Sequence, residues 1–456
     1  MYIEITLSKR NIFLVLVAVL MVLGIGSLGG FYTYDFLRTD VIEGVYLEDL
    51  SLSKLNRDAL IQRFEEYLGP RLEEPISFEA NGVVGVLTAG ELGYDFDYAK
   101  MADQALRAGR TGNWFLQRAA RRKILKEGLL IIPQVTIDQE RLERALEPLR
   151  AKTQVPPVSA RWEVLPDGYQ VKLIPAQAGR TIDLDQIADL VEDLLRQAPP
   201  YSLAIPFQQM HPKLDTEEAV GLGISEVVAS YRTYFSPSNT SRVKNIRLAA
   251  QSINNKILLP GEVLSFNRLT GPRLPESGYE EAPIIVNGEL VPGVGGGVCQ
   301  VSTTLYNAAV LANLTILERN KHSLPSAYVG LGRDATVFYD YLDLKIHNET
   351  VRPVLIKSII GHNYLDVKIL GKWVYDWRIQ IEVEELETIQ PVWTERYDPA
   401  LKPGQRVIEK EALPGRKVRV WKKYVGPEGV VSREILSTDT YQPINGVVRV
   451  GSLPKN

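Results

Sequence analysis

The residue types that can serve as nucleophile, base and orienting acid follow one another within a short stretch of this sequence. Its one cysteine is Cys299, His322 lies 23 residues later, and Asp334 lies a further 12 residues on. A thiol attacks an amide carbonyl once an imidazole has accepted its proton, and a carboxylate orients that imidazole. We therefore predict that Cys299, His322 and Asp334 form a catalytic group.

The sequence around Cys299 favours an ionised thiol. Three consecutive glycines, Gly295, Gly296 and Gly297, precede the cysteine, and apolar residues at helical spacing follow it. Unpaired N–H groups at a helix N-terminus stabilise a thiolate and also bind other anions. We predict an oxyanion- or anion-binding site at Gly296, Gly297 and Gln300, with the backbone N–H of Cys299 or Gln300 as a donor.

Two structural interpretations of the same stretch stay open. A lone cysteine is often a small buried hydrophobe, and a glycine run before a helix can bind an anion without catalysis. The other histidines are poorer partners for the thiol, since they occupy a proline-flanked linker, a strand end and a hairpin turn: His211, His347 and His362. No histidine pair has the spacing of a metal site, so we predict neither a metal nor a cofactor.

Length and composition restrict the class of protein. The 456 residues correspond to between two and four domains, and 45% hydrophobic with 23% charged residues is ordinary globular composition. These values exclude a mostly disordered chain, a collagen and a multi-span membrane protein. With 52 basic and 55 acidic residues, the net charge of -3 disfavours nucleic acid as a partner. One thiol also excludes an internal disulfide.

The N-terminal segment has the pattern of a membrane span. Residues 11–34 carry no formal charge, and Lys9 and Arg10 precede them. Such a length crosses a bilayer, and the basic flank predicts a cytoplasmic N-terminus. We predict a single-pass cell-membrane protein with a tip and anchor over residues 1–35 and an extracytoplasmic bulk. The alternative is a cleaved signal peptide, although no A-x-A pattern stands between Gly24 and Gly30.

An internal repeat follows this segment. Residues Gly93 to Asp103 align with Gly179 to Asp189, and alternating apolar residues precede each copy. Each copy is typical of strands, a glycine turn and a helix, with Asp97 or Asp183 as the helix N-cap. Further on, residues 245–257 have helical spacing, and we expect a helix there.

The stretch from about Ser230 to Ile359 resembles the VanW family, named after a protein found with glycopeptide-resistance genes. The resemblance rests on ordered motifs, among them TYFSPSNTSRVKNIRLAAQSIN, PGEVLSFN, GGGVCQVSTTLYNA, HSLP, GRDATV and DLKIHN. It implies a bacterial envelope protein acting at peptidoglycan, with Cys299, His322 and Asp334 among its motif positions. The upstream repeats resemble a peptidoglycan-binding domain, and residues 380–452 resemble a G-five domain, a small β module.

These observations predict a multidomain α+β protein with a transmembrane helix, two α+β repeat units, a central α+β VanW-like domain and a small all-β module. The domains are expected over residues 1–35, 40–210, 222–370 and 376–456. We expect an envelope protein that binds peptidoglycan or its precursors, linked to glycopeptide resistance or wall remodelling, with the membrane as a partner through its N-terminal helix. The alternative function is a Cys-His-Asp thiol hydrolase or transpeptidase acting on peptide stems.

Overall fold

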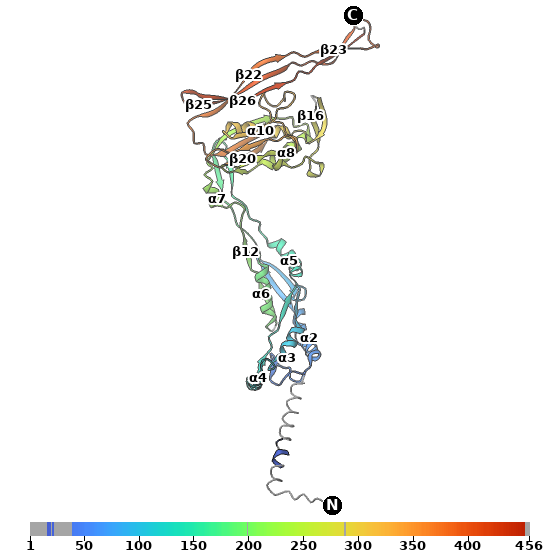
Figure 1. Cartoon of the computed structure of the whole chain (residues 1–456), viewed down its shortest axis with the longest axis vertical. Helices are drawn as coiled ribbons and strands as arrows, with labels where there is room; N and C mark the ends of the chain where they lie inside the picture. The colour runs from blue at the N-terminus through green and yellow to red at the C-terminus, as the bar shows by residue number, and fades with distance from the viewer. Residues whose placement is uncertain (1–15, 20, 22–38, 198, 287–288, 452–456) are drawn as a thin grey trace, which may run out of the picture. The chain divides into compact units, whose positions relative to one another are not determined.

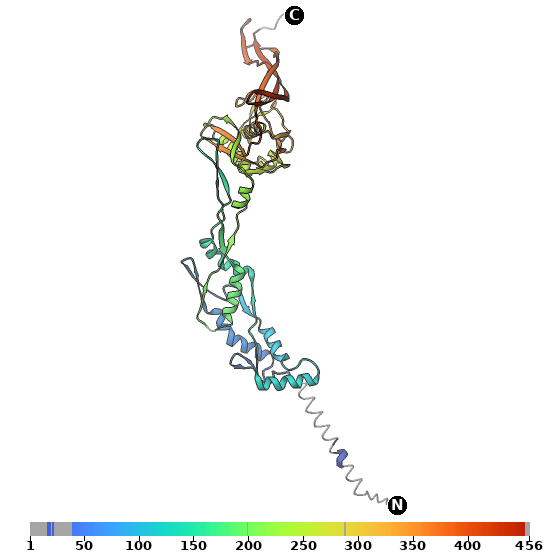
Figure 2. The same ribbon diagram turned by 90° about the vertical axis from the view of Figure 1, so that its left-hand side faces the viewer.

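The computed structural model describes residues 16–19, 21, 39–197, 199–286 and 289–451, apart from the side chains of 285–290. Within this part the chain forms two compact units. Unit 1 holds the chain up to Pro157 together with Ala178–Met210, and unit 2 holds Val158–Gln177 together with the chain from His211. Both units mix helices and strands, as predicted, and the C-terminal region is rich in strands (Figures 1 and 2).

Unit 1 surrounds one apolar core with helices and short sheets. Its helices are α2 (Arg57–Glu73), α3 (Tyr98–Arg107), α4 (Trp114–Glu127), α5 (Gln139–Thr153) and α6 (Leu184–Leu195). Its strands are β1 (Val45–Leu47), β2 (Leu50–Ser51), β3 (Pro75–Ala80), β4 (Val83–Thr88), β5 (Tyr94–Phe96), β6 (Leu129–Leu130), β7 (Val135–Ile137), β10 (Gly179–Ile182), β11 (Tyr201–Ala204) and β12 (Phe207–Met210). The core includes Phe64 of α2, Phe78 of β3 and Val191 of α6.

The two repeat aspartates in unit 1 are helix N-caps, as predicted. The Asp97 side chain accepts a hydrogen bond from the Lys100 N–H at the start of α3. The Asp183 side chain accepts one from the Gln186 N–H at the start of α6. Each carboxylate satisfies an N–H group that the first helical turn leaves unpaired, which gives both residues a structural role.

A hairpin that the sequence placed with the repeats belongs to unit 2. Strands β8 (Arg161–Val164) and β9 (Val171–Ile174) form this hairpin. Trp162 is buried with Leu355 and Leu370 of unit 2, and the short helix α7 (Thr216–Gly221) contributes Ala219 to the same cluster. Burial of this large aromatic surface explains why the grouping differs from the predicted domain over residues 40–210.

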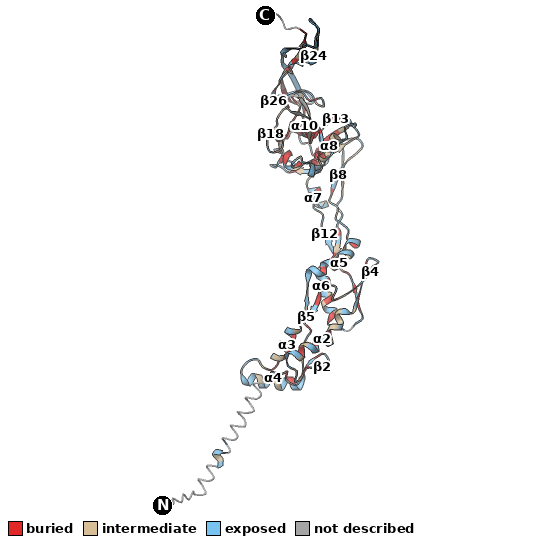
Figure 3. Cartoon of the chain, turned by 90° about the vertical axis from the view of Figure 1, so that its right-hand side faces the viewer, coloured by how far each residue is buried: buried red, intermediate tan, exposed pale blue. Residues whose placement is uncertain are grey.

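The centre of unit 2 is a four-stranded antiparallel sheet that α8 (Thr240–Ile253) and α10 (Val298–Leu311) contact (Figure 1). The sheet has the order β13 (Glu226–Tyr234), β21 (Tyr364–Gly371), β20 (Val354–Ile360), β14 (Lys256–Leu258). Around it lie β15 (Val263–Ser265), α9 (Phe266–Thr270), a 3-10 turn at Pro275–Ser277, β16 (Glu281–Val286), β17 (Glu289–Val294), β18 (Thr315–Glu318) and β19 (Lys345–His347). Buried residues gather on α8 and α10, so this core fixes the start of α10 (Figure 3).

The predicted helix over residues 245–257 is partly wrong. Helix α8 starts at Thr240 and ends at Ile253, and residues 256–258 form strand β14. Asn255 has a φ of 59°, a left-handed conformation that asparagine tolerates better than most residues and that turns the chain into the strand.

The C-terminal region forms two three-stranded sheets. The first has the order β22 (Arg378–Ile389), β25 (Gly415–Gly426), β26 (Gly429–Tyr441). The second has the order β23 (Trp393–Tyr397), β27 (Gly446–Val450), β24 (Arg406–Lys410). We call residues 378–450 the C-terminal module. Its strand β22 contacts α10, so the module packs beside the helix that carries Cys299.

The prediction of a single-pass membrane protein is corrected by the structure. Among the residues that the structure describes, no helix is both long enough and apolar enough to cross a membrane. The predicted span over residues 11–34 lies mostly outside the described residues.

Candidate active site

The glycine loop before α10 runs through a space that is too narrow for any side chain, and Cys299 follows this loop. A Cβ atom at Gly296 would lie 2.6 Å from the carbonyl oxygen of Ala282. Gly297, the N-cap of α10, has a φ of 109°, and a Cβ there would lie 2.9 Å from Ile246 of α8. Glycine is required at both positions because backbone and a buried core residue occupy the space.

Cys299 is the second residue of α10 and is partly exposed. The N–H groups on either side of it are occupied: Val298 donates to Gly295 O at 3.1 Å, and Gln300 donates to Gly297 O at 3.0 Å. The Cys299 N–H donates to no backbone carbonyl of the described chain. The thiol sulfur lies 3.5 Å from both Thr336 Oγ1 and the carbonyl oxygen of Val337.

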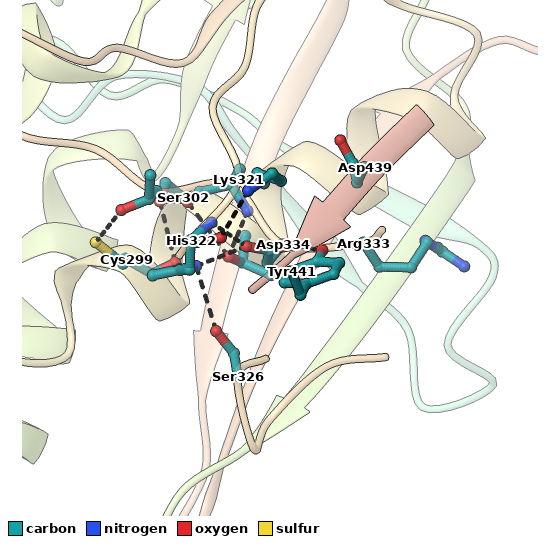
Figure 4. A network of polar contacts seen from close by, with 12 residues as sticks. Cys299, Ser302, Lys321, His322, Ser326, Arg333, Asp334, Asp439 and Tyr441 are labelled. Carbon is teal, nitrogen blue, oxygen red and sulfur yellow. Dashed lines mark hydrogen bonds and ion pairs between the residues drawn. The ribbon is translucent and has the colours of Figure 1, made fainter. Parts of the chain in front are cut away.

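His322 and Asp334 form a buried pair next to the thiol. His322 Nδ1 lies 2.7 Å from Asp334 Oδ2, and the His322 backbone N–H donates to the same oxygen at 2.6 Å. Ser326 Oγ lies 3.2 Å from the same ring nitrogen. Figure 4 shows the imidazole between Cys299 and Asp334. With Nδ1 facing the carboxylate, Nε2 is the nitrogen left for the thiol.

The electrostatics of the three side chains support a thiolate and an imidazolium. Burial raises the pKa of the Cys299 thiol, but the hydrogen bond and charge of His322 outweigh burial and lower this pKa to about 7. Burial lowers the pKa of His322, but hydrogen bonds with Asp334 and Cys299 raise it to about 9. Burial also opposes ionisation of Asp334, yet its hydrogen bonds with His322 hold its pKa below the usual value. Between these values the thiol and imidazole form an ion pair.

The C-terminal module completes the surroundings of Asp334. Tyr441 of β26 donates its hydroxyl hydrogen to Asp334 Oδ1 at 2.5 Å and accepts the Gly332 N–H at 2.8 Å. Arg319 Nη2 lies 3.2 Å from Asp334 Oδ1, and Arg319 Nη1 donates to both oxygens of Asp439 at 2.9 and 2.7 Å. All these side chains are buried, so the acid of the site is held from two directions (Figure 4).

The predicted site residues therefore divide into two groups. Cys299, His322 and Asp334 lie together, whereas every polar group of Gln300 has a partner inside the protein. Its side-chain nitrogen donates to Thr233 and Tyr234, and its side-chain oxygen accepts from Arg242. Of the two N–H groups predicted as oxyanion donors, that of Gln300 is used within the chain and that of Cys299 has no backbone acceptor in the described chain. Anion binding at Gly296, Gly297 and Gln300 stays a prediction.

Tyr441 and Asp439, like Arg319, are members of the network that the sequence did not predict. They lie more than 100 residues beyond Asp334 in a segment whose pattern indicates only a small β module. No local signal connects them to Asp334, because the contact arises from how the module packs. Within the described residues, no cluster of three or more His, Cys, Asp or Glu side chains could hold a metal ion.

Comparison with known families divides the chain into three segments. Residues 241–370 match the model described as "VanW like protein", and residues 85–201 match the one described as "Putative peptidoglycan binding domain". Residues 380–452 match the G5 domain. Together the three matches fit a cell-wall-associated protein.

Two curated proteins and one solved structure are similar to this chain. YoaR of Bacillus subtilis (strain 168) is 36% identical over 222 residues, 49% of this chain and 71% of its own length. Vancomycin B-type resistance protein VanW of Enterococcus faecalis (strain ATCC 700802 / V583) is 34% identical over 206 residues, 42% of this chain and 74% of its own. An IgA1 protease G5 domain structure is 25% identical with a TM-score of 0.14, covering 17% of this chain and 94% of that one.

Proposed function

The chain belongs to the VanW family, and from that premise we propose that it is a thiol enzyme acting on the peptide stems of peptidoglycan. The observation that carries the proposal is the His322–Asp334 hydrogen bond beside a thiol at a helix start, with His322 lowering the pKa of that thiol. A thiol that served only as a small hydrophobe would need neither an imidazole nor a buried carboxylate behind that imidazole.

The proposed reaction is acyl transfer through a thioester. The Cys299 thiolate attacks the amide carbonyl of a stem peptide, so a carbon–sulfur bond forms. The carbon–nitrogen bond then breaks as His322 Nε2 gives its proton to the leaving amine. Water, or the amine of another stem, next attacks the thioester while His322 accepts its proton, and the carbon–sulfur bond breaks to regenerate the Cys299 thiolate. The first acceptor gives a hydrolase and the second a transpeptidase.

Two groups stabilise the charges that this reaction creates. Asp334 holds the imidazole in one orientation and favours its protonated form. The Cys299 N–H at the start of α10 is a candidate donor to the tetrahedral oxyanion, because it points from a helix N-terminus and has no backbone acceptor in the described chain.

Digestion of purified peptidoglycan tests this proposal. We expect the full chain to alter the muropeptide profile, measured by liquid chromatography and mass spectrometry, and Cys299→Ala or His322→Ala to abolish the change. His362→Ala is the matched control, since this histidine is exposed in the turn between β20 and β21. Identical profiles from the wild type and Cys299→Ala would refute a thiol mechanism.

We also propose that unit 1 binds peptidoglycan, which supports catalysis by raising the local concentration of stems at unit 2. The match of residues 85–201 to a peptidoglycan-binding model favours this role. Co-sedimentation of the full chain with purified sacculi should deplete the supernatant, and Cys299→Ala should bind equally. A chain that stays in the supernatant would contradict wall binding while leaving the thiol mechanism to the digestion test.

A similarity to a vancomycin resistance protein extends the proposal to physiology. A wall enzyme that changes stem peptides would alter what a glycopeptide antibiotic meets at the wall. Deleting the gene should then shift glycopeptide sensitivity, and a Cys299→Ala copy should fail to restore it. Restoration by that copy would separate any resistance effect from the thiol.

A further inference from the structure

Two arginines, Arg242 and Arg273, flank the glycine loop that carries Cys299. The Cβ position of Gly297 lies 3.0 Å from Arg242 Cγ, and the Cβ position of Gly295 lies 3.1 Å from Arg273 Cβ. Arg242 comes from α8 and Arg273 from the segment after α9. The loop before the thiol therefore has a cationic side chain packed against it at two positions, Gly295 and Gly297.

The chain segment after Asp334 connects the catalytic group to Arg273. Asp334 contacts His322, Thr336 and Val337 contact the thiol, and the guanidinium of Arg273 lies 5.6 Å from the ring centre of Tyr339. One short segment thus touches the acid, the nucleophile and the arginine in turn. Arg273 belongs to the same site as Cys299.

Neither guanidinium has a carboxylate partner within ion-pair distance among the described residues. Arg242 Nη2 donates to Gln300 Oε1 at 3.0 Å, and Arg273 Nη2 donates to Asn267 and Thr270 at 2.7 and 3.0 Å. Burial lowers the pKa of both arginines, which marks a net cost of holding these charges. Buried charges are normally paired, and neither arginine has a carboxylate partner; the group whose negative charge reaches both guanidinium groups is the Cys299 thiolate.

Arg273 also keeps one of its donor nitrogens unused. Arg273 Nη1 is buried and has no hydrogen-bond partner. The carboxylate whose charge reaches Arg273 is Asp343, which already accepts from the Ser265 hydroxyl and from the Asn267 and Leu344 N–H groups. The protein therefore holds an unsatisfied guanidinium donor close to its nucleophile.

Space for a ligand lies beside the same arginine. Asn267 and Tyr339, which both contact Arg273, line a cavity of about 360 Å³. Arg268, on the exposed side of α9, and Lys345 line it as well, against the acidic Glu318, Asp340 and Asp343.

We propose that Arg242 and Arg273 form a carboxylate-binding subsite beside Cys299. The enzyme would then select peptides that bear a free carboxylate next to the amide that the thiol attacks. Guanidinium groups bind carboxylates through paired N–H donors, and the Nη1 of Arg273 supplies a donor that is not yet used. The inference rests on the proposed thiol chemistry and adds the substrate class.

Alkylation of Cys299 by two small reagents tests the subsite separately from turnover. Iodoacetate carries a carboxylate and iodoacetamide is its neutral counterpart, and the chain has one cysteine to react. The ratio of the two rate constants reports anion preference and cancels changes in thiol reactivity. We expect Arg273→Gln and Arg242→Gln each to lower this ratio by about tenfold, an effect that salt should weaken.

Matched variants control for charge and folding. Arg247→Gln removes the same charge from an exposed position on α8, and it should leave the ratio unchanged. Arg273→Lys keeps the charge and should keep most of the preference, so the test stands if Arg273→Gln folds poorly. A wild-type ratio that neither arginine variant lowers would overturn the subsite. A thiol inert to both reagents would overturn the proposed function and, with it, the subsite.

Discussion

Charges are paired within the protein at the Asp334 end of the Cys299–His322–Asp334 group but not at its Cys299 end. At the acid end, Arg319 lies between Asp334 and Asp439, and Tyr441 donates to Asp334, so these charges are paired within the protein. At the thiol end, Arg242 and Arg273 lack carboxylate partners. A closed network stabilises geometry, whereas partly buried cations without a carboxylate partner cost stability and are retained where a ligand supplies the counter-charge.

The largest expected effect is the loss of turnover on substitution of Asp334, the acid that orients the imidazole. Asp334→Asn keeps the shape of the side chain but loses the charge that favours the imidazolium. We expect turnover of muropeptides to fall by about 100-fold or more, the usual contribution of acid–base catalysis. A loss below about tenfold would mean that the acid end is purely structural. Circular dichroism of the variant would establish that it is folded.

Matched arginine substitutions compare the stability of the two ends. Arg319→Gln leaves two buried carboxylates without their cation and should lower the free energy of unfolding by about 3–5 kcal/mol. Arg273→Gln removes a cation that has no carboxylate partner and should cost less than about 1 kcal/mol. Urea unfolding, with hydrogen exchange of α10 amides to isolate unit 2, measures both. Equal losses of unfolding free energy in the two variants would contradict the difference in charge pairing between the two ends.

A smaller effect should follow when the C-terminal module loses one hydroxyl. Tyr441→Phe removes the donor to Asp334 and the acceptor of the Gly332 N–H, and should cost about 1–3 kcal/mol. Because the Tyr441 hydrogen bond helps to lower the pKa of Asp334, that pKa should rise as well. Tyr424→Phe, in the same sheet on strand β25, is the control. A stable Tyr441→Phe variant with an unchanged Asp334 pKa would show that the module is not coupled to the site.

The smallest expected effect is a displacement of the pH profile. Alkylation by iodoacetamide should increase as pH rises through about 7, because the Cys299 thiolate forms. Turnover should then decrease above about 9, because His322 loses the proton that the leaving amine needs. Asp334→Asn should move the descending limb to lower pH, since it removes a group that raises the pKa of His322. An unchanged descending limb would assign it to a different group.

The sequence indicated that Cys299, His322 and Asp334 would lie together because they belong to one segment and a glycine run stands two residues before Cys299; their catalytic role stays a proposal. It also predicted the N-caps Asp97 and Asp183, since a cap depends on the next three residues only. The family resemblance supplied the domain classes. Periodicity failed at residues 254–258, where one left-handed asparagine converts a helical pattern into a strand.

What the sequence could not predict are contacts between distant segments. Arg242 and Arg273 stand in stretches that look like an ordinary helix face and a turn, and nothing local distinguishes them from exposed arginines. Tyr441 and Asp439 reach the site because the C-terminal module packs beside α10. The pairing of charges, which separates the two ends of the site, is a property of that packing.

Direct titration of Cys299 tests the thiolate–imidazolium pair on which the account depends. The ultraviolet absorbance of the thiolate, taken as the difference between wild type and Cys299→Ala, should report one group, because the chain has a single cysteine. We predict a midpoint at a pH of about 7 in the wild type. In His322→Ala the midpoint should rise to about 8.5 or above, because burial of the thiol then acts without the opposing imidazolium. A thiol that titrates at about 8.5 or above in both proteins would contradict the account.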